Sequence, residues 1–259
     1  MEINKIYNEN CLDTMARMPD CFVDLTVTSP PYDNLRNYNG YSFDFEAVVK
    51  ELFRVTKKGG VVVWIVGDAT IKGSETGTSF KQALWAMECG FRLHDTMIWR
   101  KTNPPPQVKS IRRYTAAFEY MFVWSKGAPA SFNVLEIPTK KAGSPSGGST
   151  QRSADGSYSL RRIEARKGRV IKATKPMQNV WDTANQGQGA SHPAQFPEAL
   201  ARDHILSWSN EGDLVYDPFM GSGTTAKMAK INKRNYIGSE ISKEYCDIIE
   251  KRINENEGS

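Results

Sequence analysis

The sequence predicts an α/β protein built on a mainly parallel sheet. Short apolar runs of the kind that form buried strands alternate with segments whose apolar residues recur at helical spacing. A glycine turn, Gly221-x-Gly223-x-x-Ala226, lies between a predicted strand and a predicted helix, where this class places nucleotide-binding turns. The 259 residues are 39% hydrophobic and 24% charged, ordinary values for a globular chain with a sizeable core.

The predicted elements follow one another through short connections. Strands are expected over 3–10, 22–27, 61–66, 92–100, 116–124, 214–216 and 236–240. Helices are expected over 12–18, 45–55, 79–89, 192–208, directly after the glycine turn, and over 242–253. The segment 57–60, Lys-Lys-Gly-Gly, is expected to separate a helix from the strand after it. The alternating aromatic residues from Phe118 to Trp124 are expected to face the core.

The first buried strand runs into Thr28-Ser29-Pro30-Pro31-Tyr32. Two prolines stop a strand because each lacks an N–H donor and fixes its own φ. A hydroxyl, rigid carbonyls and an aromatic ring are thereby held at the carboxyl end of a strand, where open α/β sheets bind ligands. Taken alone, the stretch is equally compatible with a structural turn and a packed tyrosine. The polar residues 33–44 that follow are expected to form a loop that acts as a lid.

Positive charge is concentrated in one segment of the chain. Residues 138–180 contain ten Lys and Arg and two Asp and Glu, a balance of +8, against +5 for the whole chain. Such an insert on a near-neutral body suggests a polyanionic partner, with a solvated basic loop as the alternative. Within it, residues 142–158 are rich in Gly, Ser and Pro and are expected to form no packed element.

Composition disfavours several classes of protein. The longest apolar run, 61–66, is far shorter than a membrane span, and the first residues have no apolar stretch of signal-peptide type. The four cysteines, at positions 11, 21, 89 and 246, form no CxxC pair. A reduced, cytoplasmic protein without a structural metal is therefore expected.

An acidic residue stands where ribose recognition requires one. Glu240 ends the strand after the glycine turn, 17 residues beyond Gly223. The helix that follows the turn offers N–H donors at its start. No lysine follows the glycines, which disfavours a P-loop. Only one strand and one helix remain after this unit, so the rest of the sheet must come from the N-terminal half.

The motifs, in this order, resemble those of the amino-group DNA methyltransferases, in particular the circularly permuted β class. They are Thr28–Tyr32, the basic insert, His192-Pro193-Ala194-x-Phe196-Pro197, Asp217-Pro218-Phe219-x-Gly221-Ser222-Gly223-Thr224-Thr225 and Ile237-Gly238-x-Glu240. The resemblance covers nearly the whole chain outside 138–180. It implies a Rossmann-like S-adenosylmethionine-dependent methyltransferase fold with a doubly wound, circularly permuted sheet. Its parts would be a catalytic half, 1–137, a basic target-recognition insert, 138–180, and a cofactor-binding half, 181–259.

The resemblance also implies the site residues, with S-adenosyl-L-methionine as methyl donor and no metal. Glu240 would bind the ribose hydroxyls, Phe196 would line the site, and Asn10 stands near the adenine where the family often has Asp. The expected cofactor-binding residues are Asn10, Thr28, Phe196, Asp217, Pro218, Phe219, Gly221, Ser222, Gly223, Thr224, Thr225 and Glu240. The expected catalytic residues are Ser29, Pro30, Pro31 and Tyr32.

The chemistry of an exocyclic amine explains these catalytic residues. The lone pair is delocalised into the base, and hydrogen-bond acceptors such as Ser29 Oγ and the Pro30 carbonyl would localise it. Tyr32 would stack on the base once it is flipped out of the duplex. Methylation of ring carbon 5 would need a nucleophilic cysteine in a Pro-Cys pair, which this sequence lacks. Serine at position 29 resembles the cytosine-N4 enzymes, so cytosine is preferred and adenine N6 is the alternative.

Basic side chains are expected to hold double-stranded DNA. Phosphate contacts would supply affinity, and some arginines could contact guanine edges. The expected DNA-binding residues are Arg152, Arg161, Arg162, Lys167 and Arg169 in the insert, with Arg112 and Arg113 as an extension. For that last pair, a solvated surface role is an equal alternative.

Rival functions and open questions follow from the same motifs. A nicotinamide-dependent oxidoreductase would leave Ser29 to Tyr32 and the basic insert unexplained. A non-catalytic DNA-binding subunit would be expected to have lost motifs, and RNA is a further candidate substrate. A bacterial, archaeal or phage-encoded enzyme is expected. The recognition sequence, a cognate restriction endonuclease and the choice between monomer and homodimer stay open.

Overall fold

The computed structural model describes residues 1–31, 43–104, 106, 112–145, 150–152, 158–160, 170–184 and 196–254, with the backbone alone for 150–152 and 158–160. The chain forms two compact units. One comprises Met1–Asn133 and Asn179–Ser259, and the other is Val134–Gln178. Each unit is described by itself below.

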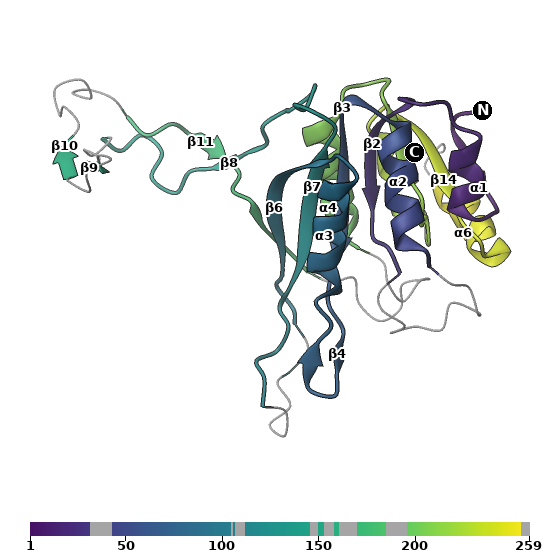
Figure 1. Ribbon diagram of the computed structural model, residues 1–259. Coiled ribbons are helices and arrows are strands. Elements are labelled where there is room, and N and C mark those ends of the chain that lie inside the picture. The colour runs from purple at the N-terminus through teal and green to yellow at the C-terminus, as the bar shows by residue number, and fades with distance from the viewer. Residues whose placement is uncertain are drawn as a thin grey trace. The chain divides into compact units, whose positions relative to one another are not determined.

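An eight-stranded sheet organises the larger unit, in the order β1-β14-β13-β2-β3-β7-β6-β12 (Figure 1). β7 runs antiparallel to both of its neighbours, and the other neighbouring pairs run parallel. The mainly parallel α/β sheet predicted from the sequence is therefore confirmed. The strands are β1 (Lys5–Tyr7), β2 (Val23–Thr28), β3 (Thr56–Val66), β6 (Arg92–Lys101), β7 (Phe118–Ser125), β12 (Val180–Thr183), β13 (Leu214–Asp217) and β14 (Asn235–Ser239).

Helices cover both faces of this sheet, as a doubly wound fold requires (Figure 1). α1 (Cys11–Ala16), α2 (Phe45–Val55) and α3 (Thr78–Glu88) pack on one face, and their buried residues share a core with Val62, Trp64 and Tyr216. α4 (Glu198–Trp208), α5 (Thr224–Ile231) and α6 (Lys243–Asn254) lie on the other. Among the described residues, no helix is both long and apolar enough to cross a membrane.

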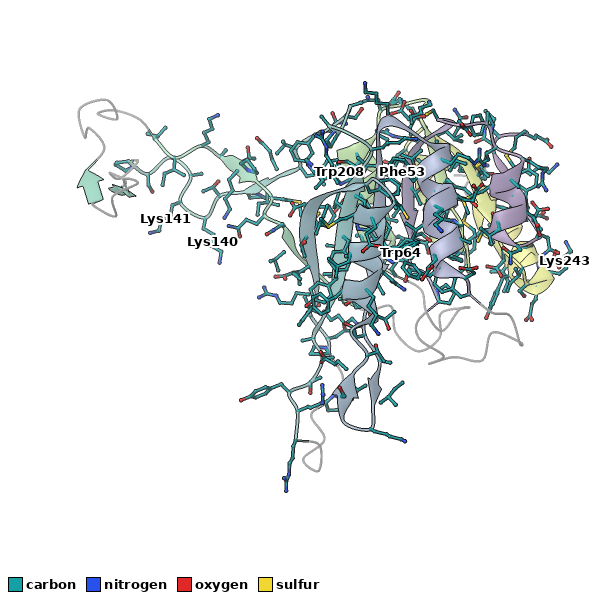
Figure 2. The ribbon with its side chains drawn as sticks, in the orientation of Figure 1. Phe53, Trp64, Lys140, Lys141, Trp208 and Lys243 are labelled. Atoms are coloured by element: carbon teal, nitrogen blue, oxygen red, sulfur yellow. The ribbon has the colours of Figure 1, made fainter. Side chains whose placement is uncertain are left out.

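Trp64 is a central contact of the core on the α1–α3 face (Figure 2). Its ring stacks on Trp124, with centroids 5.1 Å apart, and meets Phe219 edge-on at 6.2 Å. The indole N–H donates to Gln82 Oε1 of α3 at 2.8 Å. The sheet therefore binds α3 through a satisfied buried polar pair as well as through apolar contact.

Two local predictions are wrong, and proline and glycine explain both. The segment 57–60 does not separate α2 from the next strand, because β3 already begins at Thr56. Gly59 and Gly60 lie inside the strand, where the pairing of β2 with β3 shifts register. The helix predicted from residue 192 begins at Glu198, with Pro197 as its extended N-cap. Residues 192–195 lie outside the described part of the chain.

Only some of the alternating aromatic side chains of β7 belong to the hydrophobic core. Phe122 and Trp124 are buried as predicted. Phe118 is 47% exposed, so its assignment to the core is wrong. The reason is position, because Phe118 begins β7 beyond its pairing with β3, which ends where Tyr120 pairs with Val66.

The smaller unit contains two short antiparallel ladders. β8 (Glu136–Pro138) pairs with β11 (Thr174–Pro176), and β9 (Thr150–Arg152) pairs with β10 (Tyr158–Leu160). Lys140 and Lys141, labelled in Figure 2, follow β8. The composition of 142–158 predicts no packed element, and what the structure describes there is a short backbone ladder of β9 with β10, which needs no apolar pattern. Val180 belongs to β12 of the large sheet, two residues beyond the end of this unit.

Replacing Gln82 with Leu should destabilise the protein by about 1–3 kcal/mol, because the buried Trp64 indole N–H would lose its acceptor. Urea unfolding of the variant and the wild type measures the difference. Lys81→Leu, at an exposed position of the same helix, is the matched control and should change the free energy of unfolding by less than about 0.5 kcal/mol. Equal stability of Gln82→Leu and wild type would contradict this role of the pair.

Candidate functional site

Most of the candidate site residues that the structure describes gather at one edge of the sheet. β1, β14, β13 and β2 are parallel neighbours, so their carboxyl ends lie together. Asn10 follows β1, Glu240 follows β14, Asp217 ends β13, and Ser29 follows β2. Residues from both ends of the chain thus meet where open parallel sheets bind ligands.

A buried hydrogen bond joins the two halves of this edge. Thr28 Oγ1 donates to Asp217 Oδ1 at 2.6 Å, across 189 residues of sequence. The backbone N–H of Phe219 donates to the same oxygen at 3.0 Å. Thr225, in the first turn of α5, donates to the carbonyl of Val27 at 3.0 Å. The glycine turn is therefore bound to the end of the strand that leads into Ser29.

The Asp217 side chain is 1% exposed, and its charge state follows from that burial. Burial raises the pKa of Asp217 from 3.8 to about 6, while hydrogen bonds from Thr28 and Phe219 act in the opposite direction. The carboxylate form is thus held by specific donors in an apolar environment.

The glycine turn requires residues without side chains at two positions. Gly223 has φ +82° and precedes α5, and a Cβ there would lie 2.7 Å from Ile249 Cγ2. Gly238, in β14, faces the same turn, and its Cβ would lie 1.9 Å from Met220 Cε. The turn can therefore approach α6 and β14 closely only because both positions are glycine.

Glu240 is fixed against the glycine turn by backbone donors. Gly221 N–H donates to Oε2 at 2.8 Å, and Ser242 N–H donates to Oε1 at 2.9 Å. The Glu240 N–H donates to the carbonyl of Tyr7 at the end of β1. Burial raises the pKa of this carboxyl group, and the two amide donors counteract the rise. Each oxygen keeps a further lone pair for a ligand.

Asn10 caps α1 at the neighbouring strand end. Its Oδ1 accepts from the backbone N–H of Leu12 at 2.9 Å. The side-chain amide of Asn8 donates to the carbonyls of Glu240 and Ile241. Asn10 is therefore held next to the Glu240 turn, with its amide oxygen engaged in capping.

The remaining described candidates surround this edge. Phe219 contacts the rings of Phe43 and Trp64, at centroid distances of 5.2 and 6.2 Å. Phe196 is buried directly before α4. Pro218, Ser222, Thr224 and Thr225 are buried within the turn and the start of α5.

Ser29, Pro30 and Pro31 continue from β2 beside this turn. Ser29 is half-buried and follows Thr28, which is bonded to Asp217, and Pro30 is buried. Tyr32 lies outside the described residues, as do residues 33–42 of the predicted lid.

Comparisons with known proteins decide the family. A protein-family model described as DNA methylase, N6_N4_Mtase, matches residues 23–251. The orphan methyltransferase M.BamHII of Bacillus amyloliquefaciens is 55% identical over 243 residues, which cover 90% of this chain and 89% of that protein. The chain belongs to the DNA methylase family. The resemblance drawn from the motifs is confirmed, and the protein is an amino-group DNA methyltransferase with S-adenosylmethionine as its methyl donor.

More distant relatives share the fold of this methylase. The type II methyltransferase M.BglII of Bacillus subtilis is 26% identical, over 95% of this chain and 68% of its own. The cytosine-N4-specific PvuII DNA methyltransferase superposes with a TM-score of 0.72 at 20% identity, covering 98% of this chain and 88% of that one. TTHA0409 of Thermus thermophilus, in complex with S-adenosyl-L-methionine, superposes with a TM-score of 0.64 at 24% identity. The match covers 96% of this chain and 94% of that one.

The two expected arginines of the larger unit differ in their contacts. Arg113 binds Glu75 Oε1 through Nη1 at 3.1 Å and the carbonyl of Gly73 through Nη2 at 2.7 Å, whereas Arg112 is exposed. Of the insert residues, the structure describes only the backbone of Arg152, in β9. Arg161, Arg162, Lys167 and Arg169 lie outside the described residues.

A supporting cluster behind the glycine turn could not be found from the sequence. Glu198 Oε1 of α4 accepts from Lys227 of α5 at 2.8 Å and from Arg252 of α6 at 2.7 Å. Arg252 also donates to the carbonyl of Ser222 in the turn. These residues are 29 and 54 positions from Glu198 and belong to no motif, so only the packing of the three helices reveals them.

Asp217→Asn should alter the pH dependence of stability. Because the folded pKa, about 6, exceeds the ordinary 3.8, the folded wild type binds extra protons at low pH and loses that stabilisation as pH rises through 6. As pH rises from about 4.5 to about 7.5, the free energy of unfolding of the variant should increase by about 2 kcal/mol relative to that of wild type. Urea unfolding at each pH measures this difference. Asp247→Asn, on the exposed surface of α6, should gain much less. A parallel pH profile for Asp217→Asn and wild type would refute the burial effect.

Gly223→Ala should destabilise the methylase more than Gly212→Ala. Both glycines have positive φ, +82° and +87°, so each alanine costs about 1–2 kcal/mol of backbone strain. Only at position 223 does the added methyl also overlap Ile249, which adds about 1–3 kcal/mol; nothing lies within 4 Å at position 212. Thermal and urea unfolding of the two variants tests the difference, and equal losses would disprove the close approach.

Proposed function

We propose that the methylase transfers a methyl group from S-adenosylmethionine to the exocyclic amine of a base flipped out of duplex DNA, with cytosine N4 as the preferred target. The observation that supports this most directly is the Thr28–Asp217 hydrogen bond. It fixes Ser29-Pro30-Pro31 beside the glycine turn, so that a base and a cofactor could be held against each other at one sheet edge.

The residues of this edge suit the cofactor. Glu240 presents a carboxylate fixed by two backbone amides, which fits ribose hydroxyls. The turn around Gly221 and Gly223 allows the backbone to come close to the amino-acid end, with Asp217, Thr224 and Thr225 around it. Asn10, Thr28, Pro218, Phe219, Ser222 and Phe196 complete the cofactor-binding set. When bound, the cofactor supplies an electrophilic methyl group on a sulfonium.

Ser29 and Pro30 would activate the amine by accepting hydrogen bonds. The lone pair of an exocyclic amine is delocalised into the ring, so the amine is a poor nucleophile. Acceptors at the Ser29 hydroxyl oxygen and the Pro30 carbonyl favour a pyramidal nitrogen whose lone pair points at the methyl carbon. The two prolines hold these acceptors rigidly, and Tyr32 would stack on the flipped base. Most of the rate enhancement would come from positioning.

Cytosine is preferred because position 29 is serine, the residue that resembles the cytosine-N4 pattern of this family. DNA affinity would come mainly from the basic segment 138–180, including Arg152, Arg161, Arg162, Lys167 and Arg169. A salt-dependent affinity for duplex DNA is therefore expected.

The modified nucleoside identifies the target base. Genomic DNA is incubated with the purified protein and S-adenosylmethionine, digested to nucleosides and analysed by mass spectrometry. N4-methylcytosine is the expected product. N6-methyladenine alone would overturn the base assignment, and no methylated nucleoside would overturn the proposed activity.

Ser29→Ala should lower kcat by about 100-fold or more, the scale of losing one acceptor aimed at the reacting group. Affinity for S-adenosylmethionine should stay within about twofold of wild type, because the Thr28–Asp217 bond is untouched. Tritiated methyl transfer and calorimetry measure the two quantities. Thr26→Val, three residues before Ser29 on β2, is the control and should leave both unchanged. Normal turnover in Ser29→Ala would remove the role of this hydroxyl.

A further inference from the structure

A hairpin and a neighbouring segment extend beyond the sheet at the edge that carries Ser29. β4 (Thr70–Ile71) and β5 (Ser74–Glu75) form the hairpin after the carboxyl end of β3 (Figure 1). Residues 112–115 lead into β7, which is antiparallel to β3. Since β3 runs parallel to β2, the end of β3 and the start of β7 both lie at the carboxyl edge of β2. Residues 70–75 and 112–115 are here named the prong.

Arg113 holds the two parts of the prong together. Its guanidinium donates to Glu75 Oε1 at 3.1 Å and to the carbonyl of Gly73 at 2.7 Å. The positive charge of Arg113 is thereby neutralised by Glu75. These contacts indicate a structural role for Arg113, while its expected phosphate contact stays a prediction.

The prong exposes basic and apolar side chains beside the single acid Glu75 and the polar Thr70 and Ser74. Lys72 and Gly73 form the two-residue turn with φ of +49° and +82°, which places Lys72 at the tip. Lys72 and Arg112 are exposed, Tyr114 is 99% exposed and Ile71 is 53% exposed. Three cations against the single acid Glu75 leave the prong with a charge of +2.

We propose that the prong is a second DNA-contacting element, separate from the basic segment 138–180. Lys72 and Arg112 contact backbone phosphates near the target base, and Tyr114 packs against the sugars or base edges between them. The proposal rests on the proposed function, because its ligand is the duplex whose base enters the site at Ser29. A nearly fully exposed tyrosine that directly follows two arginines is suited to such a wet, charged interface.

The prong is long enough to extend from the sheet into a groove of duplex DNA. Tyr120 of β7 pairs with Val66, and Thr28 of β2 pairs with Trp64, so Tyr120 is close to the level of Pro30. Tyr114 precedes Tyr120 by six residues, which span up to about 20 Å at about 3.3 Å per residue. That length exceeds the depth of the major groove, about 8.5 Å.

The salt dependence of binding tests the two phosphate contacts. Lys72→Ala/Arg112→Ala in the full chain should flatten the slope of log K against log salt by about 1.8, measured on an arbitrary duplex of about 30 base pairs. Its affinity loss should then be about tenfold larger at 50 mM than at 200 mM salt. Lys58→Ala/Lys233→Ala, near the amino ends of β3 and β14, is the charge-matched control and should keep the wild-type slope. A wild-type slope in the prong variant would overturn the proposal.

Arg113→Met separates the structural role from direct contact. If Arg113 only positions the prong, adding Arg113→Met to the Lys72→Ala/Arg112→Ala variant should leave that variant's salt slope unchanged, because the two contacts that Arg113 positions are already absent. A further flattening of the slope by about 0.9 would show that Arg113 itself contacts a phosphate and would overturn its assignment.

Photocrosslinking locates the contact. Benzoylphenylalanine at position 114 should crosslink to the duplex, whereas the same residue at position 231, an exposed site at the end of α5 near the amino end of β14, should not. Absence of a crosslink at 114, with wild-type methylation intact, would overturn the prong and leave the proposed function standing. Crosslinking at position 114 to another protein in place of DNA would likewise overturn the proposal that the prong contacts DNA. Failure of the wild type to methylate any DNA would instead overturn the proposed function.

Discussion

The buried hydrogen bond between Thr28 and Asp217 is the contact on which the candidate site depends. It connects a strand near the start of the chain to a turn near its end, so neither half presents a complete site alone. Because Asp217 is buried, its carboxylate is stable only with donors around it, and Thr28 and Phe219 supply them. The chemistry proposed for Ser29 thus depends on an interaction made by its neighbour Thr28.

The glycine turn is held by contacts that approach it from several sides. Glu240 accepts from Gly221, Ile249 lies against Gly223, and Met220 lies against Gly238. On the far side, Arg252 connects the turn to Glu198 of α4. If the turn binds the cofactor as proposed, these contacts hold it in place before the ligand arrives, so less ordering entropy opposes binding.

In the two proposals above, DNA recognition is distributed over elements with different tasks. The basic segment 138–180 carries most of the positive charge and falls largely within the compact unit from Val134 to Gln178. The prong belongs to the same unit as the candidate catalytic residues and is fixed by the Arg113–Glu75 ion pair. A contact on the catalytic unit can set the register of the target base, whereas the basic segment can supply affinity that falls with salt.

The sequence by itself determined the α/β class, the strand-end position of Ser29-Pro30-Pro31 and the glycine turn with Glu240. Each depends on local rules of periodicity, proline geometry or glycine freedom, which few residues encode. Only the tertiary structure decided which side chains far apart in sequence contact each other: Thr28 with Asp217, Glu198 with Arg252, and Arg113 with Glu75. It also decided that 57–60 lies within β3 and that Phe118 is exposed. These outcomes depend on which strands and helices become neighbours, and side-chain partners in such packing have no fixed spacing in sequence.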